Sequence, residues 1–210
     1  MERAISAKNF QKISKQIIKS ILKGGVIIFP SDTVYGLICD ATNEKAVKKL
    51  FGIKKRTFQK PTPVFIRNIK IAKKIAKIDG KTEEFLKKIW PGKVTVVLKA
   101  KKKFPKGVLG KNNSIGLRIP RYKILNKLLS IINCPLSATS ANISGKPAST
   151  KIKEVIKQFE DKKPQPDFII DAGNLKPSKL STVVDLTSSK IKILRVGAIK
   201  KETLQKLFQF

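Results

Sequence analysis

The spacing of apolar residues changes along the chain, and each spacing predicts a different element. From residue 10 to residue 23, apolar residues recur every three or four positions with lysines between them, which predicts an amphipathic helix. Gly24 and Gly25 are expected to end this helix. The next four residues, 26–29, are all apolar and precede Pro30, as in a buried strand. We therefore expect a helix followed by a buried strand.

The same patterns predict several more helices and strands. Asn43, Asn68, Thr82 and Thr150 are suited to cap helices. Helices are expected at 44–54, 69–78, 82–90, 124–132 and 151–159, with a short one near the C-terminal end. Strands are expected at 64–66, 94–98, 115–119, 135–138, 168–171, 182–186 and 191–195. Because some strands alternate with helices and others follow one another directly, we expect a single α/β domain over residues 1–210, with a core at about 10–199 and one twisted mixed sheet flanked by helices.

Composition then restricts the kinds of function. Hydrophobic residues make up 41% of the chain, but no apolar run approaches the roughly 20 residues of a membrane span. The first residues lack the apolar segment of a signal peptide, so we expect a cytoplasmic protein without membrane contact. The chain has no histidine, which excludes Ser-His-Asp catalysis and histidine-ligated zinc. Cys39 and Cys134 lack a metal-binding spacing and are expected to be reduced thiols.

The net charge of +32 favours a polyanionic partner such as nucleic acid or a nucleotide. The lysines, however, are spread along the whole chain, and a lysine-biased coding composition explains them without any dedicated binding surface. Only six of the 46 basic residues are arginines, whose planar guanidinium groups suit phosphate and carboxylate oxygens. The arginines are therefore the more informative basic residues.

Two polar segments follow or interrupt apolar strands. PSDTVYGLICDA, residues 30–41, offers the hydroxyls of Thr33 and Tyr35 to a ligand, although the same segment could be a plain corner with Asp32 in an Asx turn. SIGLRIPR, residues 114–121, places Arg118 between apolar neighbours of a strand. A positive charge in such a place needs a partner, which is either a carboxylate or a ligand.

Two further segments gather potential phosphate-binding groups. In IKKRTFQKP, residues 53–61, Lys54 and Arg56 would project together and Lys60 could join them, although a solvated helix end explains this cluster equally well. In PLSATSANISGKP, residues 135–147, small residues surround Ser140 and Asn142. Hydroxyls and exposed backbone N–H groups can hold phosphate oxygens there, and the alternative is a turn before a helix.

Seven segments, taken in order, resemble the YrdC family. They lie between about Gly25 and Ile199 and read PSDTVYGLICDA, KKRTFQKP, WPGKVTVVL, GLRIP, ATSANISGKP, STVVDLT and ILRVGAI. Neither a Walker sequence nor a GxGxxG fingerprint is present, so a nucleotide site must be of another kind. The resemblance implies a twisted mixed sheet flanked by helices, with a large electropositive cavity on one face.

The resemblance also implies an enzyme, a nucleotidyltransferase that joins L-threonine, bicarbonate and ATP into threonylcarbamoyl-AMP and pyrophosphate. Its product would serve t6A formation at position 37 of ANN-decoding tRNAs, so the downstream threonylcarbamoyl transferase machinery and tRNA are candidate partners. Magnesium is expected on the ATP phosphates, with no metal site of the protein's own and no prosthetic group.

The residue roles implied by the resemblance follow from position within the seven segments. The catalytic set is Lys54, Arg56, Ser140 and Asn142. ATP would be bound by Arg56, Lys60, Ser114, Ser140, Asn142 and Arg195. L-threonine would be bound by Thr33, Tyr35, Arg118 and Ser181. Phe65 stands where many relatives carry a histidine close to threonine.

Two other functions are kept as alternatives. The basic cavity could hold double-stranded RNA or tRNA in a binding factor that performs no chemistry. A carbamoyl-transfer domain of the hydrogenase-maturation type normally belongs to a much larger chain with zinc-binding and acylphosphatase segments, which this sequence does not show. The chain ends soon after ILRVGAI, so the second domain of the longer relatives is expected to be absent.

Overall fold

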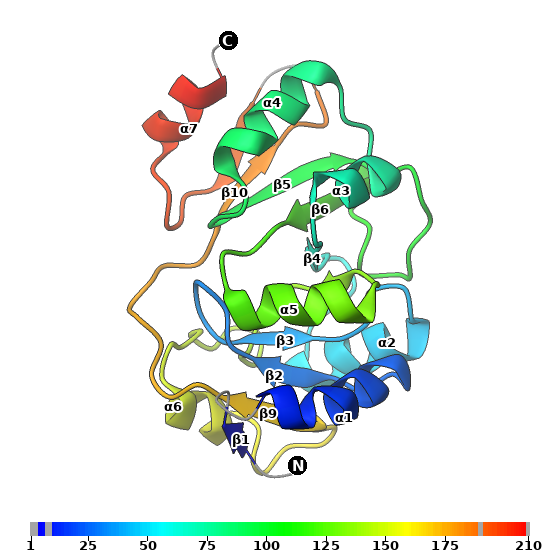
Figure 1. Ribbon diagram of the computed structural model, residues 1–210, viewed down its shortest axis with the longest axis vertical. Helices are drawn as coiled ribbons and strands as arrows, with labels where there is room; N and C mark the ends of the chain where they lie inside the picture. The colour runs from blue at the N-terminus through cyan, green and yellow to red at the C-terminus, as the bar shows by residue number, and fades with distance from the viewer. Residues whose placement is uncertain (1–3, 7–9, 189–190, 209–210) are drawn as a thin grey trace.

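The strands form two mixed sheets, whereas the sequence predicts one (Figure 1). The computed structural model describes residues 4–6, 10–188 and 191–208. The first sheet has the strand order β1-β9-β2-β3-β8, and the second has the order β11-β10-β5-β6-β4-β7. Helices flank both sheets (Figure 1), so the predicted α/β architecture with mixed strand directions is confirmed.

The first sheet collects short strands from distant parts of the chain. They are β1 (Ala4–Ser6), β9 (Phe168–Asp171), β2 (Ile27–Phe29), β3 (Gly36–Ile38) and β8 (Thr139–Ser140). Strand β9 runs parallel to β1 and β2, whereas β3 is antiparallel to β2 and β8. The sequence does not predict β1, β3 or β8, which have only two or three residues and lie outside the predicted apolar runs.

Among the residues that the structure describes, the second sheet has six strands, including the longest, β5. They are β11 (Lys192–Arg195), β10 (Thr182–Asp185), β5 (Val94–Lys99), β6 (Ser114–Arg118), β4 (Val64–Phe65) and β7 (Leu136–Ser137). Strand β5 is parallel to β10 and antiparallel to β6, and β4 is parallel to β6 and antiparallel to β7. All six coincide with predicted strands to within a few residues.

One short segment passes from the second sheet to the first. Strand β7 pairs with β4 in the second sheet, and two residues later β8 pairs with β3 in the first. Between them, the Ala138 backbone N–H donates to the Pro63 carbonyl at 2.8 Å. The polar segment PLSATS therefore links the two sheets, which explains why it contains small residues rather than a regular apolar pattern.

Seven α-helices and one short 3-10 helix (Lys111–Asn113) lie within the described ranges of the chain. The α-helices are named in chain order. They are α1 (Phe10–Leu22), α2 (Glu44–Lys54), α3 (Ile69–Ile75), α4 (Gly80–Ile89), α5 (Lys123–Ile132), α6 (Ile152–Lys157) and α7 (Lys201–Phe208). Helices α1 and α5 pack against each other beside the first sheet, and α3, α4 and α7 lie by the second (Figure 1). In this part of the chain no helix has the length and apolar character that crossing a membrane requires.

Two of the four predicted helix caps are confirmed. The side-chain oxygens of Asn43 and Asn68 accept backbone N–H groups at the starts of α2 and α3. Thr82 is not a cap, because α4 begins two residues earlier and Asp79 accepts the Thr82 backbone N–H at 2.8 Å. The prediction for Thr150 is also wrong, since the Ser149 hydroxyl accepts the Lys151 N–H before α6.

The apolar core consists of two clusters on opposite faces of the first sheet. Ile28 of β2 belongs to one cluster, whereas its neighbours Ile27 and Phe29 belong to the other, which contains the inner faces of α1 and α5. This burial on both faces explains why 26–29 is continuously apolar. Leu22, in the last turn of α1, is 56% exposed and lies outside this cluster.

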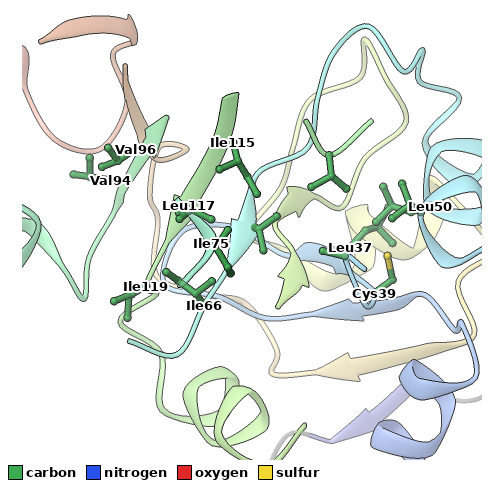
Figure 2. Close-up of a cluster of buried hydrophobic side chains, with 14 of the residues drawn as sticks. Leu37, Cys39, Leu50, Ile66, Ile75, Val94, Val96, Ile115, Leu117 and Ile119 are labelled. Carbon is green, nitrogen blue, oxygen red and sulfur yellow. The ribbon is translucent and has the colours of Figure 1, made fainter. Parts of the chain in front are cut away.

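The larger cluster continues across the interface between the two sheets. Figure 2 shows Leu37, Cys39 and Leu50 on the side of the first sheet, and Ile115 and Leu117 on the side of the second, with their side chains buried. Truncating such a side chain to alanine typically costs about 2–5 kcal/mol of unfolding free energy. The relative placement of the two sheets therefore rests on shared apolar packing, and so does any site formed between them.

Candidate functional site

A cavity of about 280 Å³ is lined by residues from both sheets and their loops. The strand residues that line it include Thr95 and Val97 of β5, Gly116 of β6 and Val183 of β10. A Cβ atom at Gly116 would lie 3.2 Å from Pro63 and 3.4 Å from Thr95, so the absence of a side chain there permits close packing at the cavity. The cavity thus exists only where the two sheets come together.

Most of the predicted site residues line this cavity although they are far apart in the sequence. They are Thr33, Tyr35, Arg56, Ser114, Arg118, Ser140, Ser181 and Arg195. The other three predicted residues, Lys54, Lys60 and Asn142, are not among the lining residues. The structure therefore brings together eight of the predicted side chains and places three elsewhere.

Arg56 and Arg195 reach the cavity with only neutral oxygen partners in the described part of the chain. The Arg56 guanidinium donates to the carbonyls of Lys60 at 2.8 Å and Pro61 at 2.9 Å. Arg195 donates to the Ser181 carbonyl at 2.9 Å and to the Ser181 hydroxyl at 3.3 Å. Burial lowers the pKa of both arginines, and the charge of Arg195 lowers that of Arg56 further. Two uncompensated, mutually repelling cations form a site that favours an anion.

Arg118 differs because a carboxylate already neutralises it. Its Nη2 lies 2.6 Å from an oxygen of Asp32, and their side chains are only 5% and 7% exposed. Its Nε donates to the Gly92 carbonyl at 2.9 Å and its Nη1 to the Thr33 hydroxyl at 3.3 Å. The guanidinium carbon lies 5.6 Å from the centre of the Phe65 ring, within cation–π range. Burial lowers the pKa of Arg118, and the charge of Asp32 opposes that shift.

The partner of Arg118 was predicted in kind but not in identity. Sequence reasoning required a carboxylate or a ligand beside this buried charge, and the structure identifies the carboxylate as Asp32. The alternative of an Asx turn at Asp32 is not what the structure shows, because Ser31 makes the local turn through the Thr33 N–H and the Val34 carbonyl. Asp32 is instead free to reach across to the strand that carries Arg118, a long-range contact with no signature in the local sequence.

Lys54 lies behind the cavity wall. It is 2% exposed, and its ammonium group donates to the carbonyls of Ser140 at 2.5 Å and Asn142 at 2.9 Å and to the Asn142 side-chain oxygen at 3.2 Å. Burial, and secondarily the charge of Arg56, lowers the pKa of Lys54 from 10.5 to about 7. Lys54 therefore connects α2 to the segment that follows β8 and holds Ser140 at the cavity.

The sequence segments that meet at this cavity match a known family. The family model for Sua5, YciO and YrdC proteins, described as telomere recombination, matches residues 19–197. The chain belongs to the Sua5/YciO/YrdC family. The resemblance drawn from the seven segments is thereby confirmed.

Relatives in this family cover the chain almost completely. A protein of Methanocaldococcus jannaschii is 38% identical over 194 residues, which cover 92% of this chain and 90% of that protein. The threonylcarbamoyl-AMP synthase of Pyrococcus abyssi is 35% identical over 188 residues, or 89% of this chain, and the match spans only 54% of the synthase. The crystal structure of P. abyssi Sua5 complexed with L-threonine superimposes with a TM-score of 0.89 at 31% identity, covering 98% of this chain and 60% of Sua5.

Asn142 supports the wall in this Sua5/YciO/YrdC-family chain. Its side-chain N–H groups donate to the carbonyls of Ile143 at 2.9 Å and Lys146 at 2.7 Å, and its oxygen accepts the Ser140 hydroxyl at 2.5 Å. The side-chain amide is thus committed to the loop. The Asn142 and Lys54 side chains therefore hold the cavity wall.

Lys60 and Tyr35, both predicted to bind a ligand, also make contacts that hold neighbouring segments in place. The exposed Lys60 contributes its carbonyl to Arg56, and its side chain lies outside the cavity lining. The Tyr35 hydroxyl donates to the Gly173 carbonyl at 2.7 Å and accepts the Ala172 N–H at 2.9 Å. Burial raises the pKa of Tyr35 to about 12, so it stays a neutral donor. Its hydroxyl fixes the segment after β9.

Sequence reasoning missed Thr95, a buried lining residue. The Thr95 and Ser181 hydroxyls lie 3.0 Å apart, and the Ser181 hydroxyl also accepts from Arg195. A polar residue inside the apolar run VTVVL is a usable signal, of the same kind that drew attention to Arg118. The site therefore offers two uncompensated arginines, one neutralised arginine and a set of buried hydroxyls around a shared space.

Proposed function

We propose that this chain is an L-threonylcarbamoyladenylate synthase, a nucleotidyltransferase that converts L-threonine, bicarbonate and ATP into threonylcarbamoyl-AMP and pyrophosphate for t6A formation. The observation that carries the proposal is the convergence of Arg56, Arg118 and Arg195 on one hydroxyl-lined cavity. Family membership supports it, as do the name of the P. abyssi synthase and the L-threonine complex of P. abyssi Sua5.

ATP would occupy the end of the cavity that holds Arg56 and Arg195. Neither arginine has a carboxylate partner among the described residues, so a triphosphate would supply the missing negative charge. The hydroxyls of Ser114 and Ser140, which line the same cavity, are suitable donors to phosphate oxygens. Magnesium would arrive with ATP as part of the substrate, bound mainly by phosphate oxygens and water.

L-threonine would lie beside Arg118, where the hydroxyls of Thr33 and Ser181 line the cavity. Because the Ser181 hydroxyl also accepts from Arg195, the two substrates would meet there. Two N–H groups of the Arg118 guanidinium have no partner in the described residues, one on Nη1 and one on Nη2. They can receive the carboxylate of an amino acid. The Phe65 ring packs against the guanidinium and limits its movement.

The reaction needs two bond-forming steps. The threonine amine attacks the carbon of bicarbonate, and loss of water leaves a carbamate. A carbamate oxygen then attacks the α-phosphorus of ATP, and the bond between the α-phosphorus and the bridging oxygen breaks to release pyrophosphate. Arg56 and Arg195 would neutralise charge that develops on the phosphates. Holding the carbamate and ATP in one cavity would supply an entropic advantage of roughly 7–11 kcal/mol at best.

The test is a direct assay of the purified protein with ATP, magnesium, bicarbonate and labelled L-threonine. We expect threonine-dependent release of pyrophosphate together with labelled threonylcarbamoyl-AMP. The Arg195→Ala variant should lose this activity, whereas Lys45→Met, which removes an exposed charge from α2, should keep it. Failure of the folded wild-type protein to release pyrophosphate in response to threonine would refute the proposal.

The same preparation tests the RNA-binding alternative. A factor that holds RNA through electrostatic contacts alone should bind it with an affinity that falls steeply with salt. That affinity should also be indifferent to ATP and L-threonine. Such binding, together with an absence of pyrophosphate release, would favour the non-catalytic function over the synthase.

A further inference from the structure

The three arginines of the cavity differ in whether a carboxylate neutralises their charge. Among the described residues, Arg118 is the one arginine that lies within 4.0 Å of a carboxylate, and that carboxylate is Asp32. Arg56 and Arg195 donate only to backbone carbonyls and hydroxyls. Arg56 and Arg195 therefore carry uncompensated positive charge, whereas Arg118 belongs to an ion pair with no net charge, and the charge of Arg195 lowers the pKa of Arg118.

The Asp32 carboxylate is held in place on both sides. One oxygen lies 2.6 Å from Nη2 of Arg118, and the other accepts the backbone N–H of Arg121 at 3.1 Å. Asp32 does not line the cavity itself, whereas Arg118 does. Any influence of Asp32 on a ligand must therefore pass through the charge and orientation of Arg118.

An ion pair and a lone guanidinium select different ligands. A triphosphate is attracted by net positive charge, and it gains little from an arginine that is already neutralised. A zwitterionic amino acid carries no net charge, so its carboxylate can use the two remaining N–H groups of Arg118 without a field that would also attract phosphate. The paired and unpaired arginines thus divide the cavity between two kinds of substrate.

We propose that Asp32 is a positioning residue that sets the specificity of the amino-acid subsite at Arg118: by neutralising Arg118, it reserves that guanidinium for a zwitterionic amino acid and confines polyphosphate to Arg56 and Arg195. The inference rests on the proposed function for the identity of the two substrates. The ion pair and the charge difference between Arg118 and the two unpaired arginines are independent of that identity.

The test replaces Asp32 with asparagine, which keeps the shape of the side chain and an oxygen for Arg118 but removes the charge. Binding of inorganic tripolyphosphate is measured by calorimetry, alone and in competition with L-threonine. In the wild-type protein, tripolyphosphate should compete with ATP and leave threonine affinity unchanged within twofold. In Asp32→Asn, tripolyphosphate should also displace threonine and lower its apparent affinity tenfold or more, because it then binds the freed Arg118.

The matched control is Asp167→Asn. Asp167 is also a partly buried carboxylate in an ion pair, with Lys49 at 2.6 Å, but it does not line the cavity. This variant should show the wild-type competition pattern. A folded Asp32→Asn protein whose tripolyphosphate still fails to displace threonine would overturn the proposal, because a purely structural role would not redirect the anion.

A second variant keeps the proposal testable if Asp32→Asn does not fold. Arg118→Gln breaks the same ion pair from the other side, and it should leave tripolyphosphate affinity within twofold of the wild type. A tenfold loss would mean that Arg118 already binds phosphate, and the division of the cavity would be wrong. These binding measurements do not require the enzyme to turn over. If wild-type tripolyphosphate competes with ATP and not with threonine, but the protein releases no pyrophosphate, only the synthase proposal is refuted.

Discussion

Replacing Lys54 with methionine gives the most quantitative prediction. The side chain is 2% exposed, and its ammonium group has three oxygen acceptors on Ser140 and Asn142. Methionine has a similar length but no charge, so it removes these hydrogen bonds and also the cost of burying a cation. The two effects oppose each other at any one pH. Their dependence on pH separates them, because only the cation titrates.

The sign of the pH effect follows from the direction of the shift. The pKa of Lys54 is about 7 in the folded protein and 10.5 when unperturbed, so between these values the unfolded chain binds more protons. The Lys54 contribution to the free energy of unfolding therefore rises with pH across this window and is lost as pH falls towards 7. With about 1.4 kcal/mol per pKa unit, the expected gain between roughly pH 7.5 and 9.5 is about 2.5 kcal/mol.

The assay is urea unfolding of wild type and Lys54→Met at several pH values in this window. The difference between their unfolding free energies should move in favour of the wild type by about 2.5 kcal/mol, because all other groups cancel in the subtraction. Lys45→Met serves as the control for loss of one exposed lysine from α2. A difference that stays flat with pH would show that Lys54 is not a strongly desolvated cation, and the reasoning would fail.

Two further substitutions test the cavity. Arg56→Ala should weaken ATP binding in calorimetry by tenfold to a hundredfold, because a charge-assisted hydrogen bond is worth roughly 1.5–3 kcal/mol. Circular dichroism should show an intact fold. Unchanged ATP affinity would place Arg56 on a solvated face. Gly197→Ala would put a Cβ atom 2.2 Å from the Leu180 carbonyl oxygen, so it should displace the segment after Arg195. It should lower stability by about 1–3 kcal/mol and weaken ATP binding, and a thermal midpoint equal to the wild type would contradict the close packing.

Local sequence patterns were sufficient to predict the elements that place many side chains in the core. The helix at residues 10–22 was predictable because its apolar side chains repeat at helical spacing, and the caps at Asn43 and Asn68 were predictable from side chains that act on their own helix. The number of sheets was not predictable from such local patterns. It depends on pairing between strands of two or three residues, such as β7 with β4 and β8 with β3, for which neighbouring residues provide no signal.

For the candidate site, too, the sequence determined one part and the tertiary structure another. The sequence by itself determined which residue types are available: hydroxyls, few arginines and no histidine, in segments shared with the Sua5/YciO/YrdC family. It also determined that a charge in the strand at Arg118 must have a partner, because an unpaired buried cation is too costly. Only the tertiary structure decided that the partner is Asp32, and that Lys54 and Asn142 lie behind the wall. Those assignments depend on which side chains face the space between two sheets, and that space is created by long-range packing.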